Sequence, residues 1–403
     1  MPLSDTVPTT GSPPDPTAAM EIASALAPRL AERAQEHDIS GAFPAADFAD
    51  LRASGLLGLM VPARLGGTGA SFADYAEVAM AIGSGAGATA LIFNMHASVT
   101  GALAHTPDEL VRQLGATDGF FVTRDRLLAE AASGALYAVA MSERGAGSRL
   151  SRITTEYRAV DGGFRVTGSK TFVSGAGHAD GYLLAARDAA STEPKVSYFV
   201  IPAGEGVRVE PTWDAMGMRA TCSHDVHFDV EVEPDALLGG VEGLAILLAQ
   251  AMPQWLVASY AAVYAGVARS AIEAGAAHLR RRGLDSLPAV RSRLGRADAA
   301  AAAAALVVRE AAARVSAEPG TPETNRWVWR AKLTAGDTAA QVASSVLEAA
   351  GTSATRRGHP LERIYRDARC GALQPATSDV CADWLGVAAL GGDPENDGGT
   401  PRW

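Results

Sequence analysis

The chain has 403 residues, 48% of them hydrophobic and 20% charged, and its formal net charge is −10. This length suffices for two or three domains around a large core. The only compact basic run, Arg280–Arg282, is too small to form a nucleic-acid binding face, so no nucleic-acid partner is expected. The three cysteines show neither metal-ligand spacing nor an even disulfide set, which predicts free thiols in the cytoplasm and no metal site.

The first third of the chain consists of a polar tail followed by helical sequence. Residues 1–19 are rich in Pro, Thr and Ser and lack the charged and apolar regions of a signal peptide, so they predict a disordered tail. Over residues 20–134, apolar side chains recur at helical spacing, and Pro and Gly stand at the ends of the periodic stretches. This segment is predicted to be an N-terminal helical domain.

The middle of the chain changes to strand-like sequence. Over residues 135–234, β-branched and aromatic residues alternate with turn residues, and Asp161-Gly162-Gly163 is a strong hairpin signal. The helical period returns over residues 235–390, and residues 391–403 form a flexible tail rich in Gly and Pro. The order of helices, sheet and helices predicts an α+β protein with a central β-domain and a C-terminal helical bundle.

One uncharged stretch, Gly243–Ala268, is long enough to span a bilayer. Gln250, Pro253 and Gln254 interrupt it, and Ala and Gly supply much of its apolar character. Its flanks are ordinary soluble sequence. We therefore expect a helix buried on all sides in the bundle and no membrane partner.

Two glycine-rich segments are candidates for a nucleotide-binding motif. Gly83–Ala88 matches most of the glycine-rich dinucleotide-binding motif. That motif must follow a strand, whereas the sequence before Gly83 has a helical pattern, which argues against a Rossmann site. In Tyr137–Leu150, a hydrophobic strand runs into a turn of small residues that lets backbone N–H groups approach a flat polar ligand. Phe172 and Ser174 follow at i and i+2 on a predicted strand, which puts an aromatic ring and a hydroxyl on one face. That pair suits an isoalloxazine ring.

These segments, together with Trp213–Val232 and His359–Arg369, resemble the acyl-CoA dehydrogenase superfamily of flavoproteins in the same order along the chain. The resemblance covers about residues 20–390. It implies an N-terminal helical domain, a central β-barrel-like domain and a C-terminal four-helix bundle, assembled as a homodimer or homotetramer. It also implies FAD between the β-domain and the C-terminal helices, extending across a subunit interface.

The resemblance implies a set of ligand contacts. Those with the flavin would be Val139, Met141, Ser142, Phe172, Ser174 and Gly351. Those with the small-molecule substrate would be Ser148, Gln254, Trp255 and Gln374. At the adenine end, Gly351 is the one glycine kept of the family's three, so FMN is an alternative to FAD.

The sequence departs from the family at its catalytic base. Counted from Arg366-Asp367-Ala368, the family's proton-abstracting glutamate is replaced by Pro375, and the alternative position for that glutamate, on the helix after the β-domain, holds Gln254. Neither side chain accepts a proton, and a positioned base contributes roughly 10²–10⁴-fold to such a reaction. Other ionisable groups that fall near the expected flavin edge are Glu143, His224, Asp225 and Asp379, for which we expect solvated or capping roles.

Three hypotheses for function follow. In the first, the chain is a flavin-dependent oxidoreductase that carries out O₂-dependent oxidation or monooxygenation of an acyl thioester or other small substrate in specialised metabolism, with a flavin reductase as partner. An apolar pocket, to which Trp255 contributes, would then surround the flavin. In the second, it dehydrogenates a CoA or carrier-protein thioester with a relocated base. In the third, it is a non-catalytic paralogue that binds flavin or serves in assembly.

Overall fold

The computed structural model describes residues 14–394, so residues 1–13 and 395–403, which belong to the two predicted tails, lie outside the described part of the chain. The first helix, α1 (Pro16–Ser40), begins inside the predicted tail 1–19. Asp15 caps it by accepting a hydrogen bond from the Ala18 N–H at 2.8 Å, and Pro16 suits the first turn. The tail prediction is therefore wrong for residues 16–19.

The segment after α1 is helical up to the first strand. It forms α2 (Ala45–Ala53), α3 (Phe72–Gly85), α4 (Gly87–His105), α5 (Asp108–Gln113) and α6 (Asp118–Ala132). A capping box starts α3, because the side chains of Ser71 and Asp74 each accept the other residue's backbone N–H. α4 is buried on nearly all sides and contacts both the C-terminal helix α8 (Ala258–Arg281) and the first strand, β1 (Tyr137–Ala140). It thus lies between the helical bundle and the sheet.

The middle segment forms one curled sheet. Its strands are β1 (Tyr137–Ala140), β2 (Glu156–Val160), β3 (Gly163–Val173), β4 (Gly181–Asp188), β5 (Val196–Pro202), β6 (Val207–Glu210) and β7 (His224–Val232). The strand order is β1-β4-β2-β3-β7-β6, with β5 pairing to β4. β1 and β2 run parallel to β4, and the other pairs are antiparallel. The predicted hairpin joins β2 to β3 through Gly162, whose φ of 84° suits glycine.

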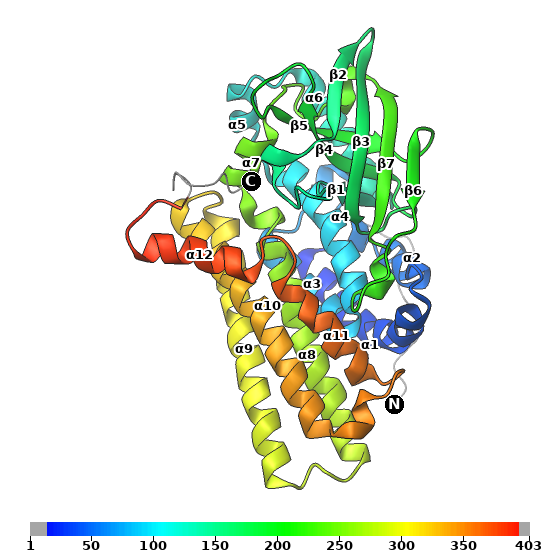
Figure 1. Ribbon diagram of the computed structural model, residues 1–403, viewed down its shortest axis with the longest axis vertical. Helices are drawn as coiled ribbons and strands as arrows, with labels where there is room; N and C mark the ends of the chain where they lie inside the picture. The colour runs from blue at the N-terminus through cyan, green and yellow to red at the C-terminus, as the bar shows by residue number, and fades with distance from the viewer. Residues whose placement is uncertain (1–13, 395–403) are drawn as a thin grey trace.

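The last segment returns to helices. These are α7 (Ala245–Ala251), α8 (Ala258–Arg281), α9 (Pro288–Ala317), α10 (Pro322–Ala350), α11 (Pro360–Arg369) and α12 (Ser378–Ala389). Figure 1 shows α8, α9, α10 and α11 side by side below the sheet, with α12 projecting from the upper end of the bundle. The fold class predicted from the sequence is confirmed. The domain limits 20–134, 135–234 and 235–390 stay predictions.

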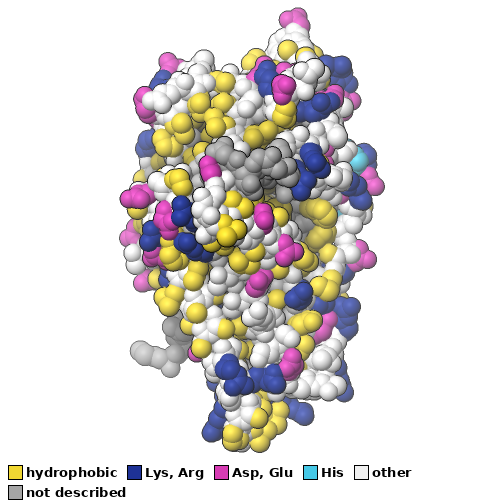
Figure 2. All heavy atoms as spheres, turned by 60° about the vertical axis from the view of Figure 1, so that its left-hand side comes forward, with side chains coloured by type: hydrophobic (Ala, Val, Ile, Leu, Met, Phe, Trp, Pro, Cys, Tyr) yellow, Lys and Arg dark blue, Asp and Glu magenta, His cyan; other side chains and the backbone are white. Residues whose placement is uncertain are grey.

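The uncharged stretch is not one continuous helix. α7 ends at Ala251, a 3₁₀ turn spans Pro253–Trp255, and α8 begins at Ala258, because Pro253 cannot continue the helix. Pro253–Arg281 is long and apolar enough to cross a membrane by length and composition, but 72% of its most apolar window is buried inside the protein. On the face shown in Figure 2, acidic and basic side chains are interspersed over the bundle.

A buried ionic contact joins α1 to α11, and hydrogen bonds from α11 hold the loop that leads into β7. The Arg366 guanidinium lies 2.6 Å from the Asp38 carboxylate on α1, and donates at 2.7 Å to the Met216 carbonyl on the loop before β7. Asp367 accepts the Met218 N–H at 2.6 Å. Gly217 passes so close to the backbone of α11 that an added Cβ would overlap it. The segment before β7 is thereby fixed against α1 and α11.

Candidate active site

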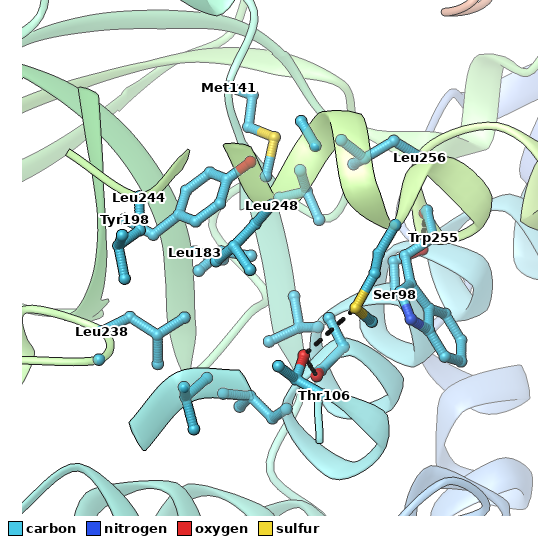
Figure 3. A pocket seen from close by; sticks show the side chains of 18 of the residues that line it. Ser98, Thr106, Met141, Leu183, Tyr198, Leu238, Leu244, Leu248, Trp255 and Leu256 are labelled. Carbon is cyan, nitrogen blue, oxygen red and sulfur yellow. Dashed lines mark hydrogen bonds between the residues drawn. The ribbon is translucent and has the colours of Figure 1, made fainter. Parts of the chain in front are cut away.

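A pocket lies where α4, the strands β1, β4 and β5, and the α7 to Trp255 segment meet (Figure 3). Its cavity volume is about 80 Å³. The pocket is therefore narrow. Val139 and Met141, two predicted flavin contacts on and after β1, form part of its wall, and Trp255 faces it from the other side.

The wall of this pocket is apolar. Among the described residues that line it there is no Asp, Glu, His, Lys or Arg, and its polar side-chain atoms come from Ser98, Thr106, Tyr198 and Trp255. Ser98 Oγ donates to the Trp255 carbonyl at 2.7 Å, and Thr106 Oγ1 donates to the Ala102 carbonyl at 2.6 Å. Both hydroxyl protons are therefore donated to backbone carbonyl oxygens. No group in the wall is suited to remove a proton from carbon.

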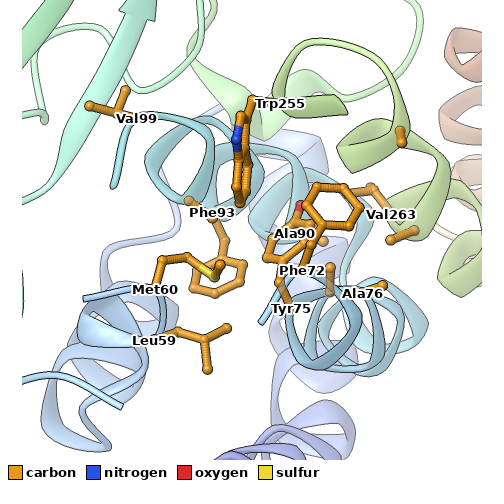
Figure 4. Close-up of a cluster of buried hydrophobic side chains, with 14 of the residues drawn as sticks. Leu59, Met60, Phe72, Tyr75, Ala76, Ala90, Phe93, Val99, Trp255 and Val263 are labelled. Carbon is orange, nitrogen blue, oxygen red and sulfur yellow. The ribbon is translucent and has the colours of Figure 1, made fainter. Parts of the chain in front are cut away.

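Trp255 is held rigidly at the edge of this pocket. Its ring meets Phe72 edge-on, with 5.0 Å between ring centroids and 70° between planes, inside the hydrophobic cluster of Figure 4. On the α4 side the indole lies directly against Gly101, where an added Cβ would overlap the ring. The side chain is 4% exposed. Glycine at this position of α4 is what allows the indole to approach the helix.

Glu143 anchors the turn that follows β1. Its carboxylate accepts hydrogen bonds from the N–H and Oγ1 of Thr154 at 2.6 and 2.7 Å and from Lys170 Nζ at 2.8 Å. Lys170 also donates to the Met141 carbonyl at 3.2 Å. Burial by itself would raise the pKa of Glu143, but the charge of Lys170 and these hydrogen bonds outweigh it and lower the pKa to about 2. Glu143 therefore supports the predicted flavin contacts and is not a base.

Phe172 adopts a backbone conformation that the sequence did not predict. Its φ is 59°, which is strained for an aromatic residue, and the β3–β7 register shifts between Lys170 and Val173. β3 ends at Val173, so the expected alternation fails: Phe172 is 60% exposed, whereas Ser174 is buried. The bulge turns the Phe172 ring outward, edge-on to Trp213 at 6.1 Å.

Ser174 ends a chain of hydroxyl groups. Its Oγ lies 2.9 Å from Ser223 Oγ, which lies 2.7 Å from Thr221 Oγ1, which in turn lies 2.9 Å from the Met218 carbonyl. When Thr221 donates to that carbonyl, the hydroxyl proton of Ser174 points to Ser223. When the hydrogen bonds between these hydroxyl groups run in the opposite direction, Ser174 is free to donate outward. Ser174 can therefore offer either a proton or a lone pair to a ligand.

The loop between α11 and α12 carries the replaced base position. Lys332, fully buried on α10, donates to the carbonyls of Gly371 and Gln374 at 2.8 and 3.0 Å. Burial lowers the pKa of Lys332 to about 8. The side chain of Gln374 has a buried Oε1 without a hydrogen-bond partner among the described residues. Pro375 is half-buried, and its backbone is positioned by these contacts.

The other candidate bases are hydrogen-bonded within the protein or exposed at its surface. Asp225 accepts two hydrogen bonds from Arg144, the shorter at 2.7 Å, and one from Thr171 Oγ1 at 2.6 Å. His224 Nδ1 accepts the Trp213 N–H at 3.1 Å. Asp379 is exposed in the first turn of α12. None of these side chains lines the pocket.

The other predicted contacts are not brought together within the chain. Gln254 is 1% exposed, its Oε1 has no hydrogen-bond partner in the described part of the chain, and it is not part of the pocket wall. Ser148 lies on the turn after β1. Gly351 follows α10 at the lower end of the bundle in Figure 1, remote from β1. Its role stays a prediction that would involve a second subunit.

Sequence reasoning missed Ser98, Tyr198 and Lys332. Ser98 and Tyr198 lie in stretches that read only as an apolar helix and an apolar strand. Lys332 could have been noticed, since it is a lone cation on the buried face of α10. A charge at a core position signals a structural or catalytic task.

Three family models match this chain: the acyl-CoA dehydrogenase N-terminal domain over residues 18–116, the middle domain over 138–230 and the C-terminal domain over 258–378. The chain belongs to the acyl-CoA dehydrogenase superfamily. The resemblance stated from its motifs is confirmed.

Similar proteins include oxygenating members of this superfamily. The amino sugar nitrososynthase RubN8 of Streptomyces rubradiris is 30% identical over 92% of this chain and 89% of its own. Dibenzothiophene monooxygenase of Rhodococcus qingshengii is 28% identical over 94% of either chain. The crystal structure of FMN-bound TdsC from Paenibacillus sp. A11-2 has a TM-score of 0.81 and 27% identity, covering 93% of this chain and 97% of that one. The chain is an acyl-CoA dehydrogenase-like flavin-dependent oxidoreductase, with FAD or FMN as its cofactor.

The residues present fit a flavin ring. Phe172 leaves a large aromatic surface exposed next to Thr171, whose N–H bonds the Ser142 carbonyl at 2.8 Å. The Ser174 hydroxyl can donate or accept a hydrogen bond. An exposed aromatic on strained backbone is typical of a ligand site. These side chains would hold the isoalloxazine, with the apolar pocket next to Met141 for a substrate.

Proposed function

We propose that this chain is a flavin-dependent monooxygenase of a small, largely apolar substrate. The observation that supports this most directly is the composition of the pocket: its wall contains no carboxylate and no imidazole, and the two family positions for the base hold Pro375 and Gln254. Dehydrogenation of an acyl thioester needs a base at the α-carbon. Oxygenation of sulfur, nitrogen or an electron-rich ring carbon has no such requirement.

The chain's own residues would position the reactants and exclude water. The bound, reduced flavin would supply two electrons, so that one atom of O₂ enters the substrate and the other leaves as water. The pocket wall around Met141, Leu183 and Leu248 keeps bulk water from the substrate. Ser174 would donate or accept a hydrogen bond at its Oγ, according to the direction of its bond with Ser223.

We further propose that a separate flavin reductase supplies the electrons. The glycine-rich segment that suggested a dinucleotide site, Gly83–Ala88, lies at the junction of α3 and α4 and not after a strand. A homodimer or homotetramer is proposed as the working form, since Gly351 would reach a flavin only through a second subunit. Analytical ultracentrifugation tests the proposed oligomeric state.

The function can be tested by comparing reactions with and without oxygen. The purified chain, with FMN or FAD and a flavin reductase plus NADH, would be offered dibenzothiophene and, separately, butyryl-CoA. We expect product only in air, carrying label from ¹⁸O₂, and only with the reductase. Bleaching of oxidised flavin by butyryl-CoA under nitrogen would overturn the proposal in favour of dehydrogenation. A chain that binds neither flavin would instead be a non-catalytic paralogue.

A further inference from the structure

The pocket beside Met141 is smaller than any molecule that contains an aromatic ring. Its cavity volume is about 80 Å³. For comparison, an engineered apolar cavity that holds one benzene molecule has a volume of about 150 Å³. A ring-bearing substrate therefore enters this pocket only if part of the wall moves, and the structure indicates which part that is.

The wall of the pocket has a deep side and a thin side. On the deep side, Val99 and Leu103 of α4 and Leu183 of β4 are 1%, 4% and 6% exposed. On the thin side, Leu244, Leu248 and Met252 line the pocket and are only half-buried (Figure 3). Leu247, on α7 between them, is 46% exposed. The width of α7 is thus what separates the cavity from solvent on this side.

α7 makes few polar contacts with the rest of the protein. Its sequence is AILLAQA, so Gln250 is its only residue with a polar side chain, and no side chain caps its N-terminus. Directly after the helix, Met252 Sδ accepts a long hydrogen bond from Thr106 Oγ1 at 3.9 Å. Apolar packing therefore holds α7 in place, and such packing allows a helix to shift at a lower cost than a set of directional hydrogen bonds would.

The chain is fixed on both sides of this segment. Before it, the Leu238 N–H donates to the Tyr198 carbonyl on β5 at 2.8 Å. After it, Ser98 Oγ holds the Trp255 carbonyl at 2.7 Å. Between these points the backbone has positive φ angles of 92°, 62° and 88° at Gly239, Gly240 and Gly243. Glycine changes these angles at little steric cost, so residues 239–243 can act as a hinge.

One polar cluster holds the hinge against the sheet. The Glu242 carboxylate accepts a hydrogen bond from the Tyr157 hydroxyl on β2 at 3.0 Å and forms an ion pair with Lys195, which precedes β5. The neighbouring Gly243 N–H donates to Ser197 Oγ on β5 at 2.9 Å. The Glu242 side chain is 34% exposed, whereas Tyr157 and Ser197 are buried. Glu242 thus joins the hinge to two strands from the surface of the protein.

We propose that residues 239–252 form a gate that opens to admit ring-bearing apolar molecules, and that Glu242 is the positioning residue that keeps the gate closed. This inference rests on the proposed function in that the gate leads to the same pocket. It assigns the size limit for substrates to the movement of α7 and not to the closed cavity. Loss of the Glu242 contacts is expected to increase the open population and leave the rest of the fold unchanged.

Hydrogen–deuterium exchange of the flavin-loaded chain measures opening of the gate. In Glu242→Ala, amides of residues 244–252 should exchange about 5–30-fold faster than in the wild type, the factor that corresponds to about 1–2 kcal/mol for the lost ion pair and hydrogen bond. Glu156→Ala is the matched control, since it removes a carboxylate of similar exposure that pairs with Arg187 outside the gate. It should exchange in this segment like the wild type. Equal exchange in Glu242→Ala and wild type would refute the role of Glu242.

Binding kinetics test the gate in the wild type, without any variant. Benzothiophene, an uncharged two-ring probe, is mixed with the flavin-loaded chain without reductase, and the flavin absorbance is followed by stopped flow. Because opening becomes limiting, the observed rate should reach a plateau as the probe concentration rises. The plateau should be higher in Glu242→Ala and unchanged in Glu156→Ala. A rate that stays linear in probe concentration, or no binding at all, would overturn the gate.

The outcomes separate the gate from the proposed function. Binding that reaches a plateau, together with the absence of ¹⁸O in every product, would refute the monooxygenase proposal and leave the gate standing. Labelled product together with a linear binding rate would refute the gate and leave the monooxygenase proposal standing.

Discussion

The Glu143–Lys170 ion pair gives the sharpest test of how the predicted flavin edge is built. Both side chains are buried, at 3% and 1% exposure, and they meet at 2.8 Å. Glu143→Gln preserves the shape but removes the negative charge, which leaves the Lys170 ammonium buried without its partner. Breaking a buried pair in this way costs about 3–5 kcal/mol of unfolding free energy. We also expect weaker flavin binding, since the pair fixes the Met141 carbonyl.

Differential scanning calorimetry measures this loss. An unfolding entropy of about 2.1 cal/mol/K per residue gives about 0.85 kcal/mol/K for 403 residues, so Tm should fall by about 4–6 °C. The double variant Glu143→Gln with Lys170→Met removes both charges and is expected to recover at least half of that loss. Glu273→Gln, in an exposed pair with Arg269, is the control and should shift Tm by less than about 1 °C.

The same pair predicts the acid dependence of stability. The pKa of Glu143 is lowered to about 2 from an ordinary value of 4.5, so the unfolded chain binds more protons between these pH values. The stabilisation is therefore fully present above about pH 4.5 and is lost as the pH falls toward 2. The Tm difference between wild type and Glu143→Gln should narrow by about 1–2 °C from pH 7 to pH 3.5. A difference below 1 °C at pH 7, or one that does not change with pH, would refute the reasoning.

Three further variants test other parts of the site. Pro375→Glu is expected to give no acyl-CoA dehydrogenase activity, because the loop backbone is fixed by contacts with α10; robust bleaching of flavin by butyryl-CoA under nitrogen would contradict this. Gly101→Ala places a Cβ against the Trp255 ring and should lower Tm by about 1–4 °C and shift the tryptophan fluorescence, so an unchanged protein would show that α4 relaxes freely. Arg366→Met leaves the buried Asp38 carboxylate unpaired and should lower Tm by about 4–6 °C, with Arg366→Lys recovering less than half, since lysine cannot make the paired contact. Full recovery by lysine would argue for charge alone.

Local sequence patterns were sufficient to predict the order of the elements. Helical spacing marked the first and last thirds of the chain, and the Asp161-Gly162-Gly163 turn marked the hairpin between β2 and β3. Pattern reasoning failed where a single backbone residue overrides periodicity. Phe172 at φ 59° breaks the alternation that the sequence suggested, and Pro253 divides a stretch that read as one helix.

The resemblance of the motifs to a known family predicted features that periodicity alone does not show. The matched segments indicated a flavoprotein, and the exchange of the family's glutamate for Pro375 was visible without coordinates. The sequence left open whether Glu143 or Asp225 had taken over as base. Only their contacts decided this, because a carboxylate that is saturated by Lys170 and Thr154, or by Arg144 and Thr171, has no lone pair directed at a substrate.

The sequence by itself thus determined the superfamily, the fold class and the loss of the usual base. The tertiary structure decided what surrounds the substrate: Ser98, Tyr198 and Trp255 come from α4, β5 and the turn before α8, and they share one pocket only after the sheet packs on the bundle. Periodicity shows which face of an element is buried but not which element it meets. The composition of a pocket depends on that meeting.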